Sequence, residues 1–145
     1  MTGLMVDASA RATRTTREGV DAVVARLQAT TSRWGRGTPL AQMRQDWDDL
    51  FPAQVDASVT PALVGGVPGT WVAAPGASNS ALLFLHGGGF QVGSSRSHRE
   101  LMAALSAEAG CRVLGLDYRL APEHRWPAAR DDARAAWDGL IAQGL

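Results

Sequence analysis

Three consecutive glycines that follow an apolar segment are the part of this sequence best suited to chemistry. The segment Ala81–Leu85 contains only apolar residues and runs directly into His86, the glycines at 87–89 and Phe90. A short apolar run bounded by glycine predicts a strand buried on both faces, as in a parallel sheet covered by helices. Glycines at its carboxyl end let the backbone turn sharply and bring its N–H groups close to a bound group. Ligands of open α/β sheets bind at this end of the strands.

Three interpretations of the glycine turn compete. A dinucleotide site needs G-x-G-x-x-G, but counted from Gly87 the last position is Val92, although Asp117 after the next predicted strand resembles a ribose-binding acid. A P-loop is excluded because no G-K-[ST] follows. The glycines could simply permit a tight turn, yet three in succession add more entropy to the unfolded chain than a turn requires. The third interpretation is an oxyanion hole, whose backbone N–H groups stabilise the charge that develops during acyl transfer. An H-G-G-G segment has this role in lipases and esterases.

The elements that must position this turn predict an α/β fold. Helical spacing predicts a helix from about 13 to 33 and a second one from about 39 to 50, and turn signals predict a β-hairpin of 55–60 and 67–74. The elements that follow predict parallel strands joined by right-handed crossovers. These elements are a strand at 81–85, a helix ending near 110, a strand at 112–116 and a helix from 127. The inward face of the last helix is expected to be Ala129, Ala133, Ala136, Trp137, Leu140 and Ile141.

Composition describes a globular chain without a specialised charge. The 145 residues are enough for one domain with a hydrophobic core, and 46% hydrophobic with 19% charged residues argues against disorder. Basic and acidic residues both total 14, so no net field favours nucleic acid or an anionic membrane. The single cysteine, Cys111, excludes an internal disulfide and a cysteine zinc site. No segment approaches the roughly 20 apolar residues of a membrane span. We therefore expect a cytoplasmic protein without a metal or cofactor.

Two motifs, in this order, resemble the hormone-sensitive-lipase-like esterases of the α/β-hydrolase fold. H-G-G-G-F at 86–90 matches that family's oxyanion segment, and D-Y-R-L-A-P-E-H at 117–124, with P-A-A from Pro127, matches its signature after the fourth strand. The resemblance covers at least residues 82 to about 140. It implies the N-terminal part of an α/β-hydrolase fold: two lid helices, a β-hairpin and two parallel β-α units in an incomplete sheet. On spacing alone, the two leading helices are better explained as simple packing on a core than as a lid. The expected domains are 1–52, the lid helices, and 53–145, the N-terminal half of the core.

The resemblance gives each residue of the first motif a role. Gly88 and Gly89 would donate the oxyanion-hole N–H groups, and Gly87 and His86 would support the loop. His86 is expected to be structural and not a catalytic base. Phe90 would line the acyl or alcohol pocket, or simply pack.

In the second motif the resemblance implies a structural role. The residues concerned are Asp117, Tyr118, Arg119 and Glu123, of which Arg119 and Glu123 are expected to form an ion pair that fixes the turn. An exposed pair contributes only about 0–1 kcal/mol, so we expect the motif to act through shape. We expect His98 and His124 at the surface.

The motif that carries the nucleophile is missing from the sequence. The family's serine lies in a G-x-S-x-G turn after the fifth strand, followed by an acid and then a histidine. Ser95 comes nearest, with Gly93 two residues before it, but Ser97 stands where the last glycine belongs. Hydrolysis needs a nucleophile and a base within hydrogen-bond reach. We therefore expect a truncated or degenerate serine carboxylesterase that is inactive by itself.

The resemblance also implies partners. In this fold the third strand lies between the fourth and the fifth, so without the fifth the edge Ala81–Leu85 is open to pairing with another chain. We expect self-association or a complementing C-terminal segment, and a small-molecule ester as the substrate of the complete enzyme. The alternative is a non-catalytic module whose glycine loop binds a small carboxylate or ester.

Overall fold

The computed structural model describes residues 16–51 and 54–145. The described residues form two compact units, which divide between Trp34 and Gly35. The first unit contains α1, Arg17–Thr31, whose first turn is capped by the side chain of Thr16, 3.1 Å from the amide nitrogen of Gly19. All other elements lie in the second unit, beginning with α2, Leu40–Asp48. The division at residue 52 that the sequence suggested stays a prediction.

The second unit is built on a four-stranded mixed sheet. Its strands are β1, Ser58–Val64; β2, Val67–Ala73; β3, Ser78–Leu85; and β4, Cys111–Leu116, in the spatial order β1-β2-β4-β3. The hairpin β1–β2 is antiparallel, β2 pairs antiparallel with β4, and β3 pairs parallel with β4. The predicted fold class, an incomplete N-terminal part of an α/β-hydrolase fold, is thereby confirmed, with β3 at one edge of the sheet.

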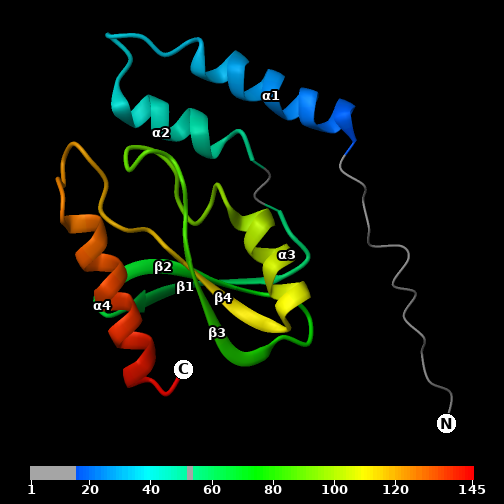
Figure 1. Ribbon diagram of the computed structural model, residues 1–145, viewed down its shortest axis with the longest axis vertical. Helices are drawn as coiled ribbons and strands as arrows, with labels where there is room; N and C mark the ends of the chain where they lie inside the picture. Colours follow the sequence, from blue (N-terminus) through cyan, green and yellow to red (C-terminus); the bar gives the residue numbers. More distant parts are fainter. Residues whose placement is uncertain (1–15, 52–53) are drawn as a thin grey trace, which may run out of the picture. The chain divides into compact units, whose positions relative to one another are not determined.

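One helix covers each face of this sheet (Figure 1). On one face α3, Arg99–Ala109, buries Met102 against Val72 and Val113. On the other face α4, Ala128–Ala142, packs its buried residues on a larger cluster. The members of that cluster are Val64, Val67, Leu114, Leu116, Tyr118, Ala136 and Leu140. Because β4 lies between both helices, its residues from 113 to 116 are buried and continuously apolar or glycine, as the sequence predicted. The same prediction was wrong for β3: residues 81–84 are only half-buried and Leu85 is 49% exposed, because this strand lies at the edge of the described sheet.

The apolar face of α4 is narrower than predicted. Ala136 and Leu140 are buried as expected, but Trp137 and Ile141 are 56% and 55% exposed. Neither of these two side chains joins a hydrophobic cluster of the described residues. Asp132 is buried on the same helix, where Arg119 pairs with it.

The hairpin strands also differ from their predicted bounds. β1 extends to Val64 instead of ending at residue 60, because the two-residue turn Gly65-Gly66 sets the register from Val64 opposite Val67 to Ser58 opposite Ala73. Both turn glycines have positive φ, 59° and 78°. No helix in the described part of the chain is long and apolar enough to cross a membrane.

The two turn glycines provide a matched test of how α4 packs on the hairpin. A Cβ on Gly65 would overlap the backbone carbonyl of Ala135 in α4, whereas one on Gly66 meets nothing within 4 Å. Gly66→Ala should lower the free energy of unfolding by about 1–2 kcal/mol through its left-handed φ alone. Gly65→Ala should lower it by about 2–5 kcal/mol, since overpacking adds to the same strain. Urea unfolding measures both values, and equal losses would contradict this packing.

Candidate active site

The glycine turn follows the last residue of β3 and doubles back on itself. Gly88, Gly89 and Phe90 have φ values of 128°, 61° and 59°. The carbonyl of Gly88 accepts hydrogen bonds from the amides of Gln91 and Val92, both at 3.1 Å. A Cβ on Gly88 would overlap the carbonyl of Val92, so only glycine fits there.

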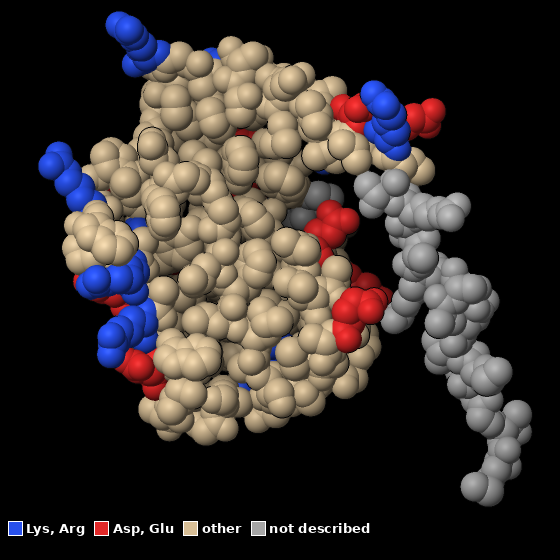
Figure 2. Space-filling model, viewed as in Figure 1, with Lys and Arg blue, Asp and Glu red and all other residues tan. Residues whose placement is uncertain are grey.

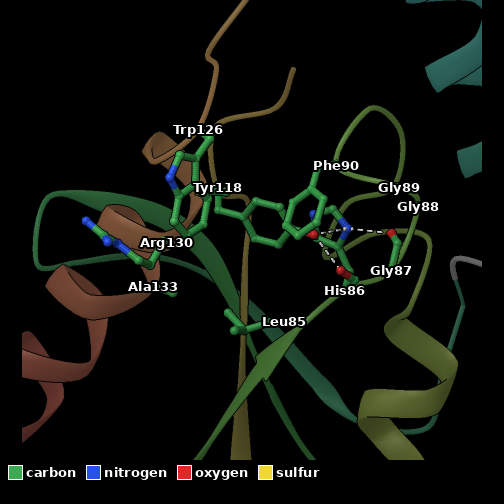
Figure 3. Close-up of a pocket in the computed structure, with 11 residues that line it drawn as sticks. Leu85, His86, Gly87, Gly88, Gly89, Phe90, Tyr118, Trp126, Arg130 and Ala133 are labelled. Carbon is green, nitrogen blue, oxygen red and sulfur yellow. Dashed lines mark hydrogen bonds between the residues drawn. The ribbon is translucent and has the colours of Figure 1, made fainter. Parts of the chain in front are cut away.

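The amides of this turn remain available. In residues 16–51 and 54–145, no protein acceptor takes the N–H of Gly88 or of Gly89. Both residues line a cavity of about 370 Å³ between the end of β3 and the start of α4 (Figure 3). The other lining residues are mostly apolar or aromatic: Leu85, His86, Gly87, Phe90, Tyr118, Trp126, Ala129, Arg130 and Ala133.

His86 holds the base of the turn. Its side chain is buried, and its ring stacks on Tyr118 with centroids 4.3 Å apart and planes 10° from parallel. The Tyr118 hydroxyl donates to the His86 carbonyl at 2.5 Å, and His86 Nδ1 lies 2.9 Å from the carbonyl of Gly87. A carbonyl only accepts, so Nδ1 carries the proton of this contact. Burial lowers the pKa of His86 below its ordinary value of 6.5, which favours the neutral ring.

The other two histidines differ from each other. His124 is exposed, as expected. His98 was expected at the surface but is half-buried, and its ring lies 5.7 Å from Phe84, 5.8 Å from His86 and 6.2 Å from Phe51, measured between centroids. The residue directly precedes α3, and its ring packs among these three side chains.

Asp117 joins the end of β4 to the loop that follows the glycine turn. Its carboxylate accepts hydrogen bonds from the amide of Ser95 at 2.6 Å and from the Ser95 hydroxyl at 3.0 Å. The same hydroxyl lies 2.8 Å from the hydroxyl of Thr70. Asp117 therefore has structural contacts, and Ser95 is 3% exposed with its oxygen engaged on both sides.

The predicted ion pair between Arg119 and Glu123 is wrong. Arg119 pairs instead with Asp132 of α4, at 2.7 Å, and its backbone amide also donates to that carboxylate. Burial raises the pKa of Asp132, but the hydrogen bonds and charge of Arg119 outweigh it and the pKa lies below its ordinary value. Glu123 pairs with Arg44 at 2.8 Å, and this hydrogen bond lowers the pKa of Glu123 to about 2. Both partners are distant in sequence, so spacing within the motif could not reveal them.

Helix α2 contacts the site through residues that the sequence did not single out. Arg44 donates to the carbonyl of Gln91, one residue past Phe90, at 2.8 Å. Asp48 accepts from the Ser94 hydroxyl at 2.7 Å, and Asp49 pairs with Arg96 at 3.1 Å. On a predicted amphipathic helix these residues read as an ordinary solvated face, and no local signal distinguishes them.

Among the described residues, no group of three or more His, Cys, Asp and Glu side chains is placed to hold a metal ion. The site is therefore built from backbone amides, aromatic side chains and hydrogen-bonded loops. Its arrangement is suited to bind an anion or a polarised carbonyl oxygen next to an apolar surface.

Known proteins that resemble this chain have the α/β hydrolase fold. Residues 82–144 match the family model of the α/β hydrolase fold. A mutant of the esterase E40 has a TM-score of 0.80 and 38% identity over 86% of this chain and 43% of that one. An esterase from the bacterial hormone-sensitive lipase family also has a TM-score of 0.80, with 37% identity over 89% of this chain and 44% of its own.

The curated relatives are ester hydrolases. The ethyl acetate hydrolase of Pseudomonas putida is 49% identical over 69 residues, which are 48% of this chain and 22% of that protein. The acetyl-hydrolase of Streptomyces hygroscopicus is 46% identical over 81 residues, 56% of this chain and 27% of that protein. The chain thus spans less than half the length of the proteins it matches. The predicted resemblance is confirmed: the chain is related to the hormone-sensitive-lipase-like esterases and corresponds to an N-terminal part of their fold.

The lowered pKa of His86 predicts a pH dependence of stability. The unfolded chain binds a proton at His86 near pH 6.5, whereas the folded chain does so only at lower pH. The stabilisation by neutral His86 is therefore complete above pH 6.5 and is lost as the pH falls toward the folded pKa. NMR titration of the His86 ring protons should give a midpoint below pH 6.5. The free energy of unfolding, measured with urea, should fall as the pH is lowered from 7.5 to 5. His86→Asn, which cannot titrate, should reduce this dependence; a midpoint at or above 6.5 would contradict the proposed burial.

Proposed function

We propose that this chain supplies the oxyanion hole of a serine carboxylesterase, with Gly88 and Gly89 as the donors. One observation carries the proposal: the amides of these two residues line an apolar cavity at the carboxyl end of β3 and donate to no acceptor in the described part of the chain. The kinship with ester hydrolases supports it.

The chemistry of ester cleavage needs such donors. Attack on an ester carbonyl places negative charge on its oxygen, and one fixed backbone donor is worth about 2.7–4 kcal/mol of barrier. The apolar lining strengthens this interaction, because it keeps the local dielectric low. Phe90, 61% exposed beside the two glycines, and Trp126 across the cavity are the surfaces on which the acyl or alcohol part would rest.

We further propose that this chain hydrolyses no ester by itself. The sequence contains no G-x-S-x-G turn. Ser95, the nearest candidate, is buried and its hydroxyl is bonded to Asp117 and Thr70. Neutral His86 has Nδ1 engaged with the carbonyl of Gly87, which fits a supporting role better than that of a base. The nucleophile, acid and base would then come from a complementing C-terminal segment.

The open edge of β3 is the proposed place for that segment, or for a second copy of the chain. β3 pairs only with β4 among the described residues. Large apolar side chains are exposed near this edge, Leu85 at 49% on β3 and Trp137 and Ile141 on α4. Figure 2, seen from the same side as Figure 1, shows the middle of this face largely free of charged side chains, which lie mainly toward its sides. Unpaired strand edges with apolar surroundings favour association with another strand.

The rival proposal is a non-catalytic module that binds a small carboxylate or ester at the same loop. The same free amides favour it, since a carboxylate oxygen can take the place of the oxyanion. The two proposals differ only in whether a second segment restores catalysis.

An esterase assay separates these functions. The chain alone should not hydrolyse p-nitrophenyl butyrate, and a mixture with the C-terminal segment of a related esterase should do so. Activity of the chain alone would contradict the proposed inactivity. If neither sample is active while butyrate still shifts the NMR signals of the Gly88 and Gly89 amides, the binding module is the correct function.

Sedimentation velocity tests the open edge. The chain should associate as its concentration rises, and Leu85→Lys should shift it toward monomer, because a charge on an edge strand opposes strand pairing. Leu101→Lys is a matched control, since Leu101 is also 49% exposed but lies on α3. A chain that stays monomeric at high concentration would rule out self-association through β3.

A further inference from the structure

The guanidinium of Arg44 joins both loops that form the site. Its Nε donates to the carbonyl of Gln91 at 2.8 Å, and its Nη2 donates to the carbonyl of Ala121 at 3.1 Å. Nη1 and Nη2 also donate to the two carboxylate oxygens of Glu123, each at 2.8 Å. One side chain on α2 thus contacts the loop after β3 and the loop after β4, which are otherwise far apart in sequence.

These contacts close a ring of hydrogen bonds around Phe90. The amide of Ala121 donates to the carbonyl of Phe90 at 2.8 Å, while the carbonyl of Ala121 accepts from Arg44. Arg44 also holds the carbonyl of Gln91, the next residue. The carbonyls of Phe90 and Gln91, which follow each other in the chain, are therefore both hydrogen-bonded.

These hydrogen bonds lie next to a strained point of the backbone. Phe90 has a φ of 59°, in the left-handed region that residues other than glycine rarely adopt. Such a conformation persists only where the surroundings determine it, and it is found mainly at functional sites. Phe90 directly follows Gly89, so a change of its conformation would also reorient the amides of the turn (Figure 3).

The shape of arginine is needed here more than its charge. All three guanidinium nitrogens are used, in a planar fork that a lysine ammonium cannot reproduce. The side chains of Arg44 and Glu123 are 30% and 50% exposed, and ion pairs with such exposure add little to global stability. The contact is thus better suited to fix local geometry than to hold the fold together.

We propose that Arg44 is a positioning residue, which keeps the Gly88 and Gly89 amides directed at the cavity by holding the carbonyls of Gln91 and Ala121. This inference rests on the proposed oxyanion hole and adds α2 to it. Helix α2 then acts as a fixed support of the turn, through a residue that touches neither substrate nor nucleophile.

Amide hydrogen exchange and butyrate binding, both followed by NMR on the whole chain, test the role. In Arg44→Met, the amides of Gln91, Val92 and Ala121 should exchange about tenfold faster, because local opening of the ring becomes easier. The affinity for butyrate, read from the Gly88 and Gly89 signals, should fall by a similar factor, with little change in the melting temperature. Arg44→Lys should give intermediate values, because one ammonium cannot span all three acceptors.

Arg96→Met is the matched control. Arg96 also pairs with α2, through Asp49 at 3.1 Å, with similar exposure of 44% and 54%, but it does not contact the glycine turn. This variant should leave the exchange rates and the butyrate affinity unchanged. Unchanged exchange in Arg44→Met, or faster exchange with unchanged butyrate affinity, would overturn the inference. Absence of butyrate shifts in the wild-type chain would overturn the proposed oxyanion hole instead, while the exchange rates would still report whether Arg44 holds the loop.

Discussion

The site depends on one constraint: the hydrogen bonds that close the glycine turn use its carbonyls as acceptors and leave the amides of Gly88 and Gly89 unbonded. The turn after β3 is closed by the Gly88 carbonyl, which accepts from Gln91 and Val92, and by the Phe90 carbonyl, which accepts from Ala121. Backbone donors in a folded chain are nearly always paired, so donors that remain unpaired beside a cavity mark a place where a ligand can supply the acceptor. The absence of a Cβ at Gly88 is what allows the chain to fold back so tightly.

The rest of the second unit supports that turn from several directions. β4 pairs with β3, and the two residues that follow it, Asp117 and Tyr118, bind the loop at Ser95 and the carbonyl of His86. From one side, α4 is fastened to the loop after β4 by the pair of Arg119 and Asp132. The second motif therefore contributes a framework: it contacts the glycine turn and the loop after it through Asp117, Tyr118 and Ala121, and it leaves the amides of Gly88 and Gly89 unbonded.

The sequence predicted contacts between residues close together in the chain better than contacts between distant residues. The apolar run at 81–85, the glycine pair at 65–66 and Pro127 at the start of the last helix are local signals, and the elements they predicted exist close to the predicted places. The predicted bond between Arg119 and Glu123 was wrong, because two charges close in sequence need not share a turn when each has a partner on a helix. His98 was misjudged for a similar reason, since its ring lies among side chains from two segments distant in sequence, Phe51 and the pair Phe84 and His86.

The sequence by itself determined the order of the elements, the buried strand β4, the glycine bend that follows β3 and the family that the chain resembles. These follow from residue types over short distances: periodic burial sets helices and strands, and the missing side chains of glycine set the bend. Only the tertiary structure decided which charges pair, that α2 contacts the loop after the turn through Arg44, and that Trp137 and Ile141 of α4 stay exposed. Such contacts join residues tens of positions apart, and a side chain's partner is fixed only when packing of the sheet brings the segments together.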